Sequence, residues 1–140
     1  MPKLLKKFKT VMVFGVFDRL HPGHLSFLKQ AKKYSEKLMV VVARDSAVRE
    51  LKNKNPSQNE KERMAALRKV AGVNKVVLGD KKQGSYGVIK KYKPDVIGLG
   101  YDQKWLAGDL KKYMRVGCLS KIKMVKLKAY YSKKLHSSLL

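Results

Sequence analysis

Two of the three histidines, His21 and His24, stand three residues apart in the stretch GVFDRLHPGH, residues 15–24. An apolar run precedes this stretch and a helical pattern follows it, so we expect both imidazoles on one side of a first helical turn. Free backbone N–H groups at a helix start attract anions, and imidazole donors above them would stabilise charge that builds up on a phosphate. The alternatives are a pair of metal ligands or two unrelated surface histidines. A metal would need at least one further ligand, so we predict phosphate contact and assign no metal ligand.

Two glycines and a proline in the same stretch suit such an anion site. Gly15 would let the backbone come close to a ligand, and Gly23 carries no side chain that would block its approach. Pro22 fits the first position of a helix.

Four aspartates stand just past the ends of the expected strands: Asp18, Asp45, Asp80 and Asp102. In a parallel sheet those ends share one edge, where ligands of open α/β sheets bind. Aspartate is also a good turn former and helix N-cap after any strand. Both interpretations stay open, with Asp18 and Asp102 the stronger candidates for function.

Apolar segments alternate with helical patterns along the whole chain, which is typical of βαβ units. We expect strands over residues 10–17, 38–43, 76–78, 96–99 and 122–127, and helices over 24–36, from Glu60 onward and over 106–114. Residues 53–59 read as a polar loop. The predicted fold is therefore an α/β, Rossmann-like doubly wound parallel sheet of about five strands, in a single domain that covers residues 1–140.

The composition excludes several other classes. One cysteine, Cys118, forms no internal disulfide framework and makes a structural zinc site improbable. No apolar run approaches the roughly 18 residues of a membrane span, so we expect no membrane partner and a cytoplasmic location. The 33 Lys and Arg against 10 Asp and Glu give a formal charge of +23, which leaves three interpretations open: a polyanionic small substrate, nucleic acid, or a solvated surface with no partner. The excess is 27 Lys to 6 Arg, whereas recognition of base edges and bidentate phosphate contacts favour Arg.

The stretch 15–24 resembles the signature G-[ST]-F-D-x-x-H-x-G-H of the cytidylyltransferase-like nucleotidyltransferases. Val16 departs from it, because the family has Thr or Ser there, but its backbone N–H remains. Glu62-Arg63 is similar to the family's E-R pair, and GYDQ at residues 100–103 is similar to its G-x-D-[QK]. The sequence HSS at residues 136–138 resembles the start of a last helix in the archaeal FAD synthetase branch. In the family's order, these motifs span residues 10–138.

The resemblance implies nucleotidyl transfer, in which an acceptor phosphomonoester attacks the α-phosphate of a nucleoside triphosphate and pyrophosphate leaves. It implies that His21 and His24 donate to the triphosphate, and that the N–H groups of Val16 and Phe17 hold the α-phosphate. It also implies that Lys52 bridges the donor and acceptor phosphates.

Further roles follow from the same resemblance. Arg63 would lie near the acceptor or the triphosphate, Asp18 would orient the loop or a water on Mg²⁺, and Asp102 would contact the nucleotide. Tyr130 or Tyr131 would stack on a base or a flavin, or else pack under a loop. Ser137 and Ser138 would offer hydroxyl and N–H groups to the β- and γ-phosphates, although plain N-capping is the alternative.

The function expected from this resemblance is transfer of AMP from ATP, with Mg²⁺, to FMN. A cytidylyl- or adenylyltransferase that uses CTP or ATP on glycerol 3-phosphate or a sugar phosphate is the alternative. A nucleic-acid-binding protein on a nucleotide-binding fold is the alternative of another class. The family commonly forms dimers, so we expect a homodimer.

Overall fold

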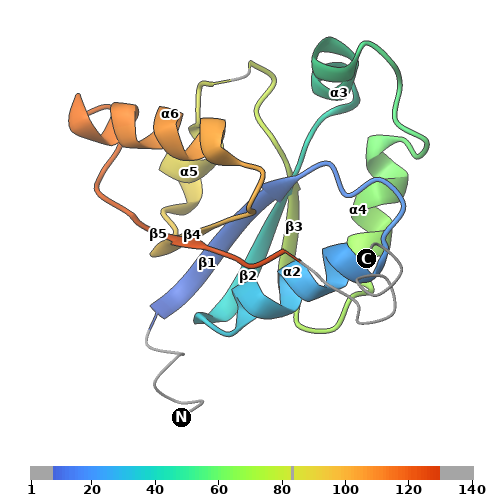
Figure 1. Ribbon diagram of the computed structural model, residues 1–140, viewed down its shortest axis with the longest axis horizontal. Coiled ribbons are helices and arrows are strands. Elements are labelled where there is room, and N and C mark those ends of the chain that lie inside the picture. The colour runs from blue at the N-terminus through green and yellow to red at the C-terminus, as the bar shows by residue number, and fades with distance from the viewer. Residues whose placement is uncertain (1–7, 83, 130–140) are drawn as a thin grey trace, which may run out of the picture.

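The computed structural model describes residues 8–82 and 84–129 (Figure 1). Five strands form one sheet with the order β3-β2-β1-β4-β5, and every neighbouring pair is parallel. The elements in chain order are β1 (Phe8–Gly15), α2 (Pro22–Lys32), β2 (Ser35–Val42), α3 (Asp45–Lys52), α4 (Glu60–Arg68), β3 (Lys75–Leu78), α5 (Gly87–Tyr92), β4 (Val96–Leu99), α6 (Lys104–Arg115) and β5 (Lys123–Lys126). This arrangement confirms the predicted doubly wound α/β sheet of five strands.

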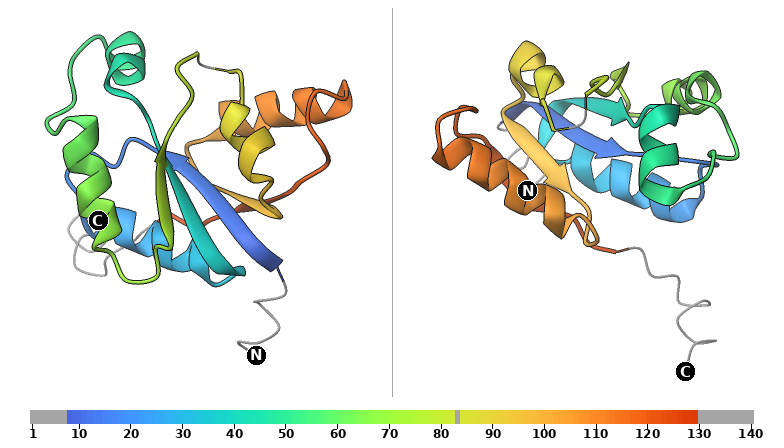
Figure 2. Two further views of the ribbon diagram at one scale, coloured as in Figure 1. Left: turned by 180° about the vertical axis from the view of Figure 1, so that it is seen from behind. Right: turned by 90° about the horizontal axis from the view of Figure 1, so that it is seen from above.

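The two faces of the sheet are covered by different helices, as the front view (Figure 1) and the view from behind (Figure 2) show. Successive side chains of β1 point to opposite faces. Val11 and Val13 join the core that includes Leu28 of α2 and Leu67 of α4. Met12 joins the core that α5 and α6 cover. Burial on both faces is the reason that the strands read as nearly continuous apolar runs.

Two predicted boundaries are wrong at the start of the chain. Strand β1 ends at Gly15 rather than at residue 17, because Phe17 adopts a left-handed conformation with φ of 54° that no strand accommodates. Helix α2 ends at Lys32 rather than at residue 36, so Glu36 belongs to β2. The N–H of Tyr34 closes the last turn on the carbonyl of Ala31. The helical spacing of apolar residues therefore predicted a helix that extends past the short connection between α2 and β2.

The strand order creates a switch point beside β1. The chain leaves β1 toward β2 on one side, whereas β4 and β5 lie on the other side. Connections from the carboxyl ends of β1 and β4 therefore run in opposite directions, and we call the region between their loops, where ligands of open α/β sheets bind, the crevice. Residues 16–21 and residues 100–103 follow these two strands. The tertiary structure thus brings together two motifs that are some eighty residues apart in the sequence.

Within residues 8–82 and 84–129, no helix has the length and apolar character needed to cross a membrane.

Candidate nucleotide-binding site

His21 caps the N-terminus of α2. Its Nδ1 accepts hydrogen bonds from the N–H of Gly23 at 3.0 Å and, more weakly, from that of His24 at 3.4 Å. Pro22 occupies the first helical position, as the sequence predicts. Because Nδ1 is an acceptor, a neutral His21 carries its hydrogen on Nε2. The ring is exposed, so this capping contact leaves an imidazole N–H donor for a ligand.

His24 lies directly against His21. The two rings stack with their centroids 3.7 Å apart and their planes 21° apart, which confirms that both imidazoles share one side of the helix start. The Nδ1 atom of His24 is buried and has no hydrogen-bond partner in the described part of the chain. Burial lowers the pKa of His24 below 6.5, and the neighbouring His21 lowers it further against a smaller opposing effect of Asp18. His24 is therefore neutral at pH 7 and donates from one ring nitrogen at most.

Phe17 forms a wall behind the histidines. Its buried ring meets His24 edge to face at 5.5 Å between centroids, and it packs against Phe27 at 6.2 Å. The ring also lies over Gly15, where a Cβ atom would stand 2.7 Å from the Phe17 Cε2 atom. The structure thus explains the glycine at position 15 in a way that the sequence did not suggest, because the missing side chain makes room for the Phe17 ring.

The phosphate loop, which we define as residues 16–20, offers unpaired backbone donors. The N–H groups of Val16 and Phe17 make no hydrogen bond to any residue in the described ranges. Both N–H groups belong to the segment that leaves β1 at the switch point. The positions are those at which the resemblance implies contact with the α-phosphate.

Asp18 ties the phosphate loop to the segment before α4. Its two carboxylate oxygens accept hydrogen bonds from the N–H groups of Ser57 at 2.8 Å and Gln58 at 2.9 Å. The side chain of Gln58 also binds the phosphate loop, because its Oε1 accepts a hydrogen bond from the N–H of Arg19 at 3.0 Å. Desolvation alone would raise the pKa of Asp18, but the two N–H donors and the positive charges of Arg63 and Arg19 hold it below the ordinary value of 3.8. Asp18 is therefore ionised at neutral pH and orients the loop.

Arg63 lies beneath the phosphate loop and is fully buried. Its Nη1 donates to the carbonyl oxygens of Val16 at 2.9 Å and Ala43 at 2.8 Å, and its Nε donates to that of Gln58 at 3.0 Å. Its Nη2 forms an ion pair with Asp45 at 2.6 Å. The resemblance implies a place near the acceptor or the triphosphate, and the structure shows a guanidinium that is fully buried and donates four hydrogen bonds to protein groups. It holds together the ends of β1 and β2 and the segment before α4.

Helix α4 begins at Glu60, as the sequence predicts, and Glu62 of the E-R pair takes part in its N-terminal cap. Asn59 and Glu62 form a capping box, in which the Asn59 side chain accepts from the N–H of Glu62 and the Glu62 side chain accepts from the N–H of Asn59. This box fixes the first turn of α4, and with it the backbone from which Arg63 reaches under the loop.

The turn after β4 closes the other side of the crevice. Gln103 accepts a hydrogen bond from the N–H of Gly100 at 2.8 Å and donates to the carbonyl of Phe14 at 2.9 Å. The second bond ties this turn to the last residues of β1. Asp102 is exposed, and its Oδ1 lies 3.1 Å from the point where a Gly100 Cβ would stand, so a side chain there would crowd it. The side chain of Phe27, a residue of α2, reaches this turn, and its Cε1 atom lies 3.5 Å from the point where a Gly100 Cβ would stand.

The four aspartates that follow the strands all lie at the predicted edge of the sheet, but they make different contacts. Asp45 begins α3 and pairs with Arg63, and Asp80 accepts a long bond of 3.4 Å from the N–H of Val88. These contacts agree with the structural interpretation of both residues. Only Asp102 presents a carboxylate for which the described residues supply no hydrogen bond.

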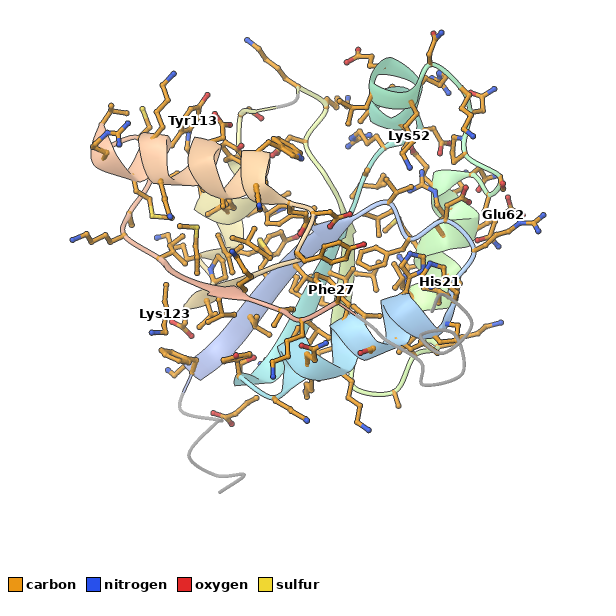
Figure 3. All side chains as sticks on the ribbon, in the orientation of Figure 1. His21, Phe27, Lys52, Glu62, Tyr113 and Lys123 are labelled. Carbon is orange, nitrogen blue, oxygen red and sulfur yellow. The ribbon has the colours of Figure 1, made fainter. Side chains whose placement is uncertain are left out.

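Lys52 is the last residue of α3 and is exposed. Figure 3 shows Lys52, His21 and Glu62 on the side of the molecule where β1 and β2 end, opposite Tyr113 and Lys123. Tyr130, Tyr131, His136, Ser137 and Ser138 lie outside the described residues.

The described ranges contain no group of three His, Cys, Asp or Glu residues arranged to hold a metal ion. Mg²⁺ is usually bound through one or two carboxylates together with substrate phosphates. The carboxylate of Asp102 fits this mode, whereas that of Asp18 already accepts two backbone N–H groups. A cation that enters with a triphosphate therefore agrees with the residues present better than a resident metal does.

Sequence reasoning missed Gln58. It lies in the polar loop 53–59, and its partners Asp18 and Arg19 are 39 or 40 residues away in the sequence. No local pattern marks a glutamine for such a role. A nearby signal was the resemblance of Glu62-Arg63, which pointed to the start of α4 but not to the segment before it.

Comparison with known proteins agrees with this geometry. Residues 12–129 match the family model described as cytidylyltransferase-like. The FAD synthase of Aciduliprofundum boonei is 44% identical over 120 residues, which cover 86% of this chain and 78% of that protein. The FAD synthase of Pyrococcus abyssi is 41% identical over 121 residues, which cover 86% and 81%.

Solved structures give the same fold. A crystal structure described as the lipopolysaccharide core biosynthesis protein from Thermoplasma volcanium is 36% identical, with a TM-score of 0.80, and the match covers 89% of this chain and 99% of that one. The pantoate-beta-alanine ligase of Francisella tularensis is 14% identical with a TM-score of 0.58, which supports the fold alone. The family model covers most of the chain, and the relatives are similar over most of their own length. The chain therefore belongs to the cytidylyltransferase-like family and is a nucleotidyltransferase.

Proposed function

We propose that the protein is an FAD synthase, which transfers AMP from ATP to the phosphate of FMN and releases pyrophosphate. The observation that carries the proposal is the meeting of the capped start of α2, with His21 and His24, and the Gly100–Gln103 turn at one switch point. The FAD synthase relatives, similar over most of the chain, support FMN as the acceptor.

The reaction needs little covalent help from the protein. An FMN phosphate oxygen forms a bond to the α-phosphorus of ATP, and the bond from that phosphorus to the pyrophosphate oxygen breaks. A phosphomonoester has a second pKa near 6, so the attacking group is largely ionised at neutral pH and needs no general base. Catalysis then rests on in-line positioning and on stabilisation of the charge on the transferring group.

In this scheme the loop and the helix start hold the triphosphate. The N–H groups of Val16 and Phe17 bind the α-phosphate, and His21 donates from Nε2. Neutral His24 donates to the phosphate oxygens without adding a charge that the site would have to desolvate. Gly23 and Pro22 present the start of α2, whose N–H groups and dipole favour the anion.

The remaining groups position the two substrates. Lys52 bridges the donor and acceptor phosphates, and Asp102 contacts the nucleotide, while Asp18 and Arg63 act by holding the phosphate loop. Tyr130, Ser137 and Ser138 are assigned to base stacking and to the β- and γ-phosphates. Mg²⁺ enters as part of the ATP substrate and neutralises charge on the triphosphate.

The test is an assay of the purified protein with ATP, FMN and Mg²⁺, in which FAD and pyrophosphate are measured together. We expect equal amounts of the two products. Parallel reactions with CTP, and with glycerol 3-phosphate or a sugar phosphate in place of FMN, should release much less pyrophosphate. If pyrophosphate is released only with one of those acceptors, that compound replaces FMN as the proposed acceptor. If no combination of nucleotide and acceptor releases pyrophosphate, the enzymatic role is overturned.

We also propose that the protein works in the cytoplasm, where its proposed substrates are small soluble anions, and that it forms a homodimer. Sedimentation analysis of the purified chain tests the dimer, and a monomer at micromolar concentration would contradict it. The charge of +23 focuses anionic substrates into the crevice. Salt-sensitive binding of RNA at physiological salt would point instead to the nucleic-acid alternative.

A further inference from the structure

Two large aromatic side chains are exposed at the carboxyl end of β4. Tyr101 is 61% exposed and Trp105 is 66% exposed, whereas the strand residues just before them are buried. Tyr101 lies in the turn after the strand, and Trp105 lies in the first turn of α6. Ligands of open α/β sheets bind at this edge, and ligand sites are lined mainly by hydrophobic and aromatic side chains.

The backbone that carries these rings is fixed relative to the phosphate loop. Gln103 stands between them in the sequence and bonds both to Gly100 and to the carbonyl of Phe14. Phe14 is only two residues before Val16. The turn is therefore fastened to the same strand end that begins the phosphate loop, and Trp105 follows on a regular helix.

We infer that Tyr101 and Trp105 bind the isoalloxazine ring of the acceptor FMN, an inference that rests on the proposed function. The oxidised flavin ring is large, planar and electron-poor, and it stacks favourably on electron-rich indole and phenol rings. Of the two substrates, FMN has the larger aromatic face.

The ring would then leave its phosphate tail free to reach toward the phosphate loop. The N–H groups of Val16 and Phe17 stand at the end of β1, to which Gln103 ties the aromatic turn. The same turn carries Asp102, so one short segment serves the acceptor through its aromatic side chains and the nucleotide through its carboxylate.

The chain offers a direct reporter, because Trp105 is its one tryptophan. Tryptophan emission overlaps flavin absorption, so FMN bound against Trp105 should quench the protein's fluorescence strongly. We expect saturable quenching by FMN in the unchanged protein, weak quenching by ATP, and a weaker apparent affinity for FMN in Tyr101→Ala. Absence of quenching by FMN, or quenching by ATP as strong as that by FMN, would overturn the inference.

Steady-state kinetics supply the second measurement. Loss of one stacked ring in Trp105→Ala should raise the KM for FMN roughly tenfold while the KM for ATP stays the same, and Trp105→Phe should recover part of the loss. The matched control is Val116→Ala, which removes an exposed apolar side chain from the other end of α6, about 16 Å along the helix, and should leave both constants unchanged. An unchanged KM for FMN in Trp105→Ala, or a raised KM for ATP in its place, would contradict the assignment.

The two proposals fail in different ways. If the unchanged protein makes FAD but neither aromatic variant alters the KM for FMN, the ring-binding role is wrong and the FAD synthase activity stands. If the unchanged protein makes no FAD, the proposed activity is wrong, and the fluorescence titration with FMN alone still decides whether these two rings bind a flavin.

Discussion

Replacing Arg63 by methionine removes a guanidinium that is wholly buried and forms four hydrogen bonds, while most of its hydrocarbon volume is kept. The variant leaves the carboxylate of Asp45 without its partner, and the carbonyl groups of Val16, Ala43 and Gln58 without the donor they share. Breaking one side of a buried ion pair costs about 3–5 kcal/mol. The Asp45 side chain is 23% exposed, so water recovers part of its solvation and the lower half of that range applies.

We therefore expect Arg63→Met to lower the free energy of unfolding by about 3 kcal/mol. Urea unfolding followed by circular dichroism measures this, and the midpoint should fall by about 1–3 M. Arg68→Met is the matched control, because it removes the same charge from an exposed position on the same helix and should change stability by less than about 0.5 kcal/mol.

The same variants test whether Arg63 acts through the loop or on the substrate. A guanidinium that touched the triphosphate would tolerate Arg63→Lys in the fold and lose mainly ATP affinity. If the buried guanidinium instead joins three segments of the chain, Arg63→Lys should also lower the stability of the protein, because lysine carries its donors on one atom. Stability of Arg63→Met within about 1 kcal/mol of Arg68→Met would refute the reasoning.

Three further predictions concern the helix start and its surroundings. Gly15→Ala places a methyl group against the Phe17 ring and should destabilise the fold by about 1–3 kcal/mol, whereas Gly108→Ala, which meets nothing within 4 Å in α6, should stabilise it by about 0.5–1 kcal/mol; thermal unfolding compares the two. His24→Gln should lower the turnover of FAD formation by at least about a hundredfold with an unchanged circular dichroism spectrum, and an equally active variant would make this histidine a bystander. Burial and His21 lower the pKa of His24 below 6.5, so on acidification His24 binds a proton more readily in the unfolded chain than in the folded chain. The stability contributed by the neutral ring is therefore full above pH 6.5 and is lost as the pH falls through the folded pKa. The urea midpoint should therefore fall less between pH 7 and pH 5 in His24→Gln than in the unchanged protein, and equal falls would contradict the assignment.

The sheet was largely predictable because its signal is local. The strands β1, β2 and β4 are largely buried, so each reads as an apolar run, and the predicted β4 at residues 96–99 matches the observed bounds. Helix α5 escaped prediction because it has only six residues and begins from Tyr86 in a left-handed conformation. Six residues are too few to show a helical period, and no N-capping side chain marks the start.

For the candidate site, local spacing predicted that His21 and His24 share one side of the start of α2, with Pro22 at the first helical position. These features depend on contacts within four residues, and such contacts follow from local spacing. The sequence also determined that aspartates follow the strands. It did not determine what each aspartate does, because a carboxylate after a strand can cap a turn, pair with an arginine or face a ligand.

How the phosphate loop is held, and what stands opposite it, depends on contacts between elements that are distant in the sequence. Sheet order places β4 beside β1, and only then can Gln103 bond to Phe14 and bring the exposed aromatic turn to the crevice. In the same way, Arg63 and Gln58 act on the loop across 39 to 47 residues of chain. Bonds over such separations depend on the packing of whole elements and on loop closure, which leave no period or spacing in the sequence to read.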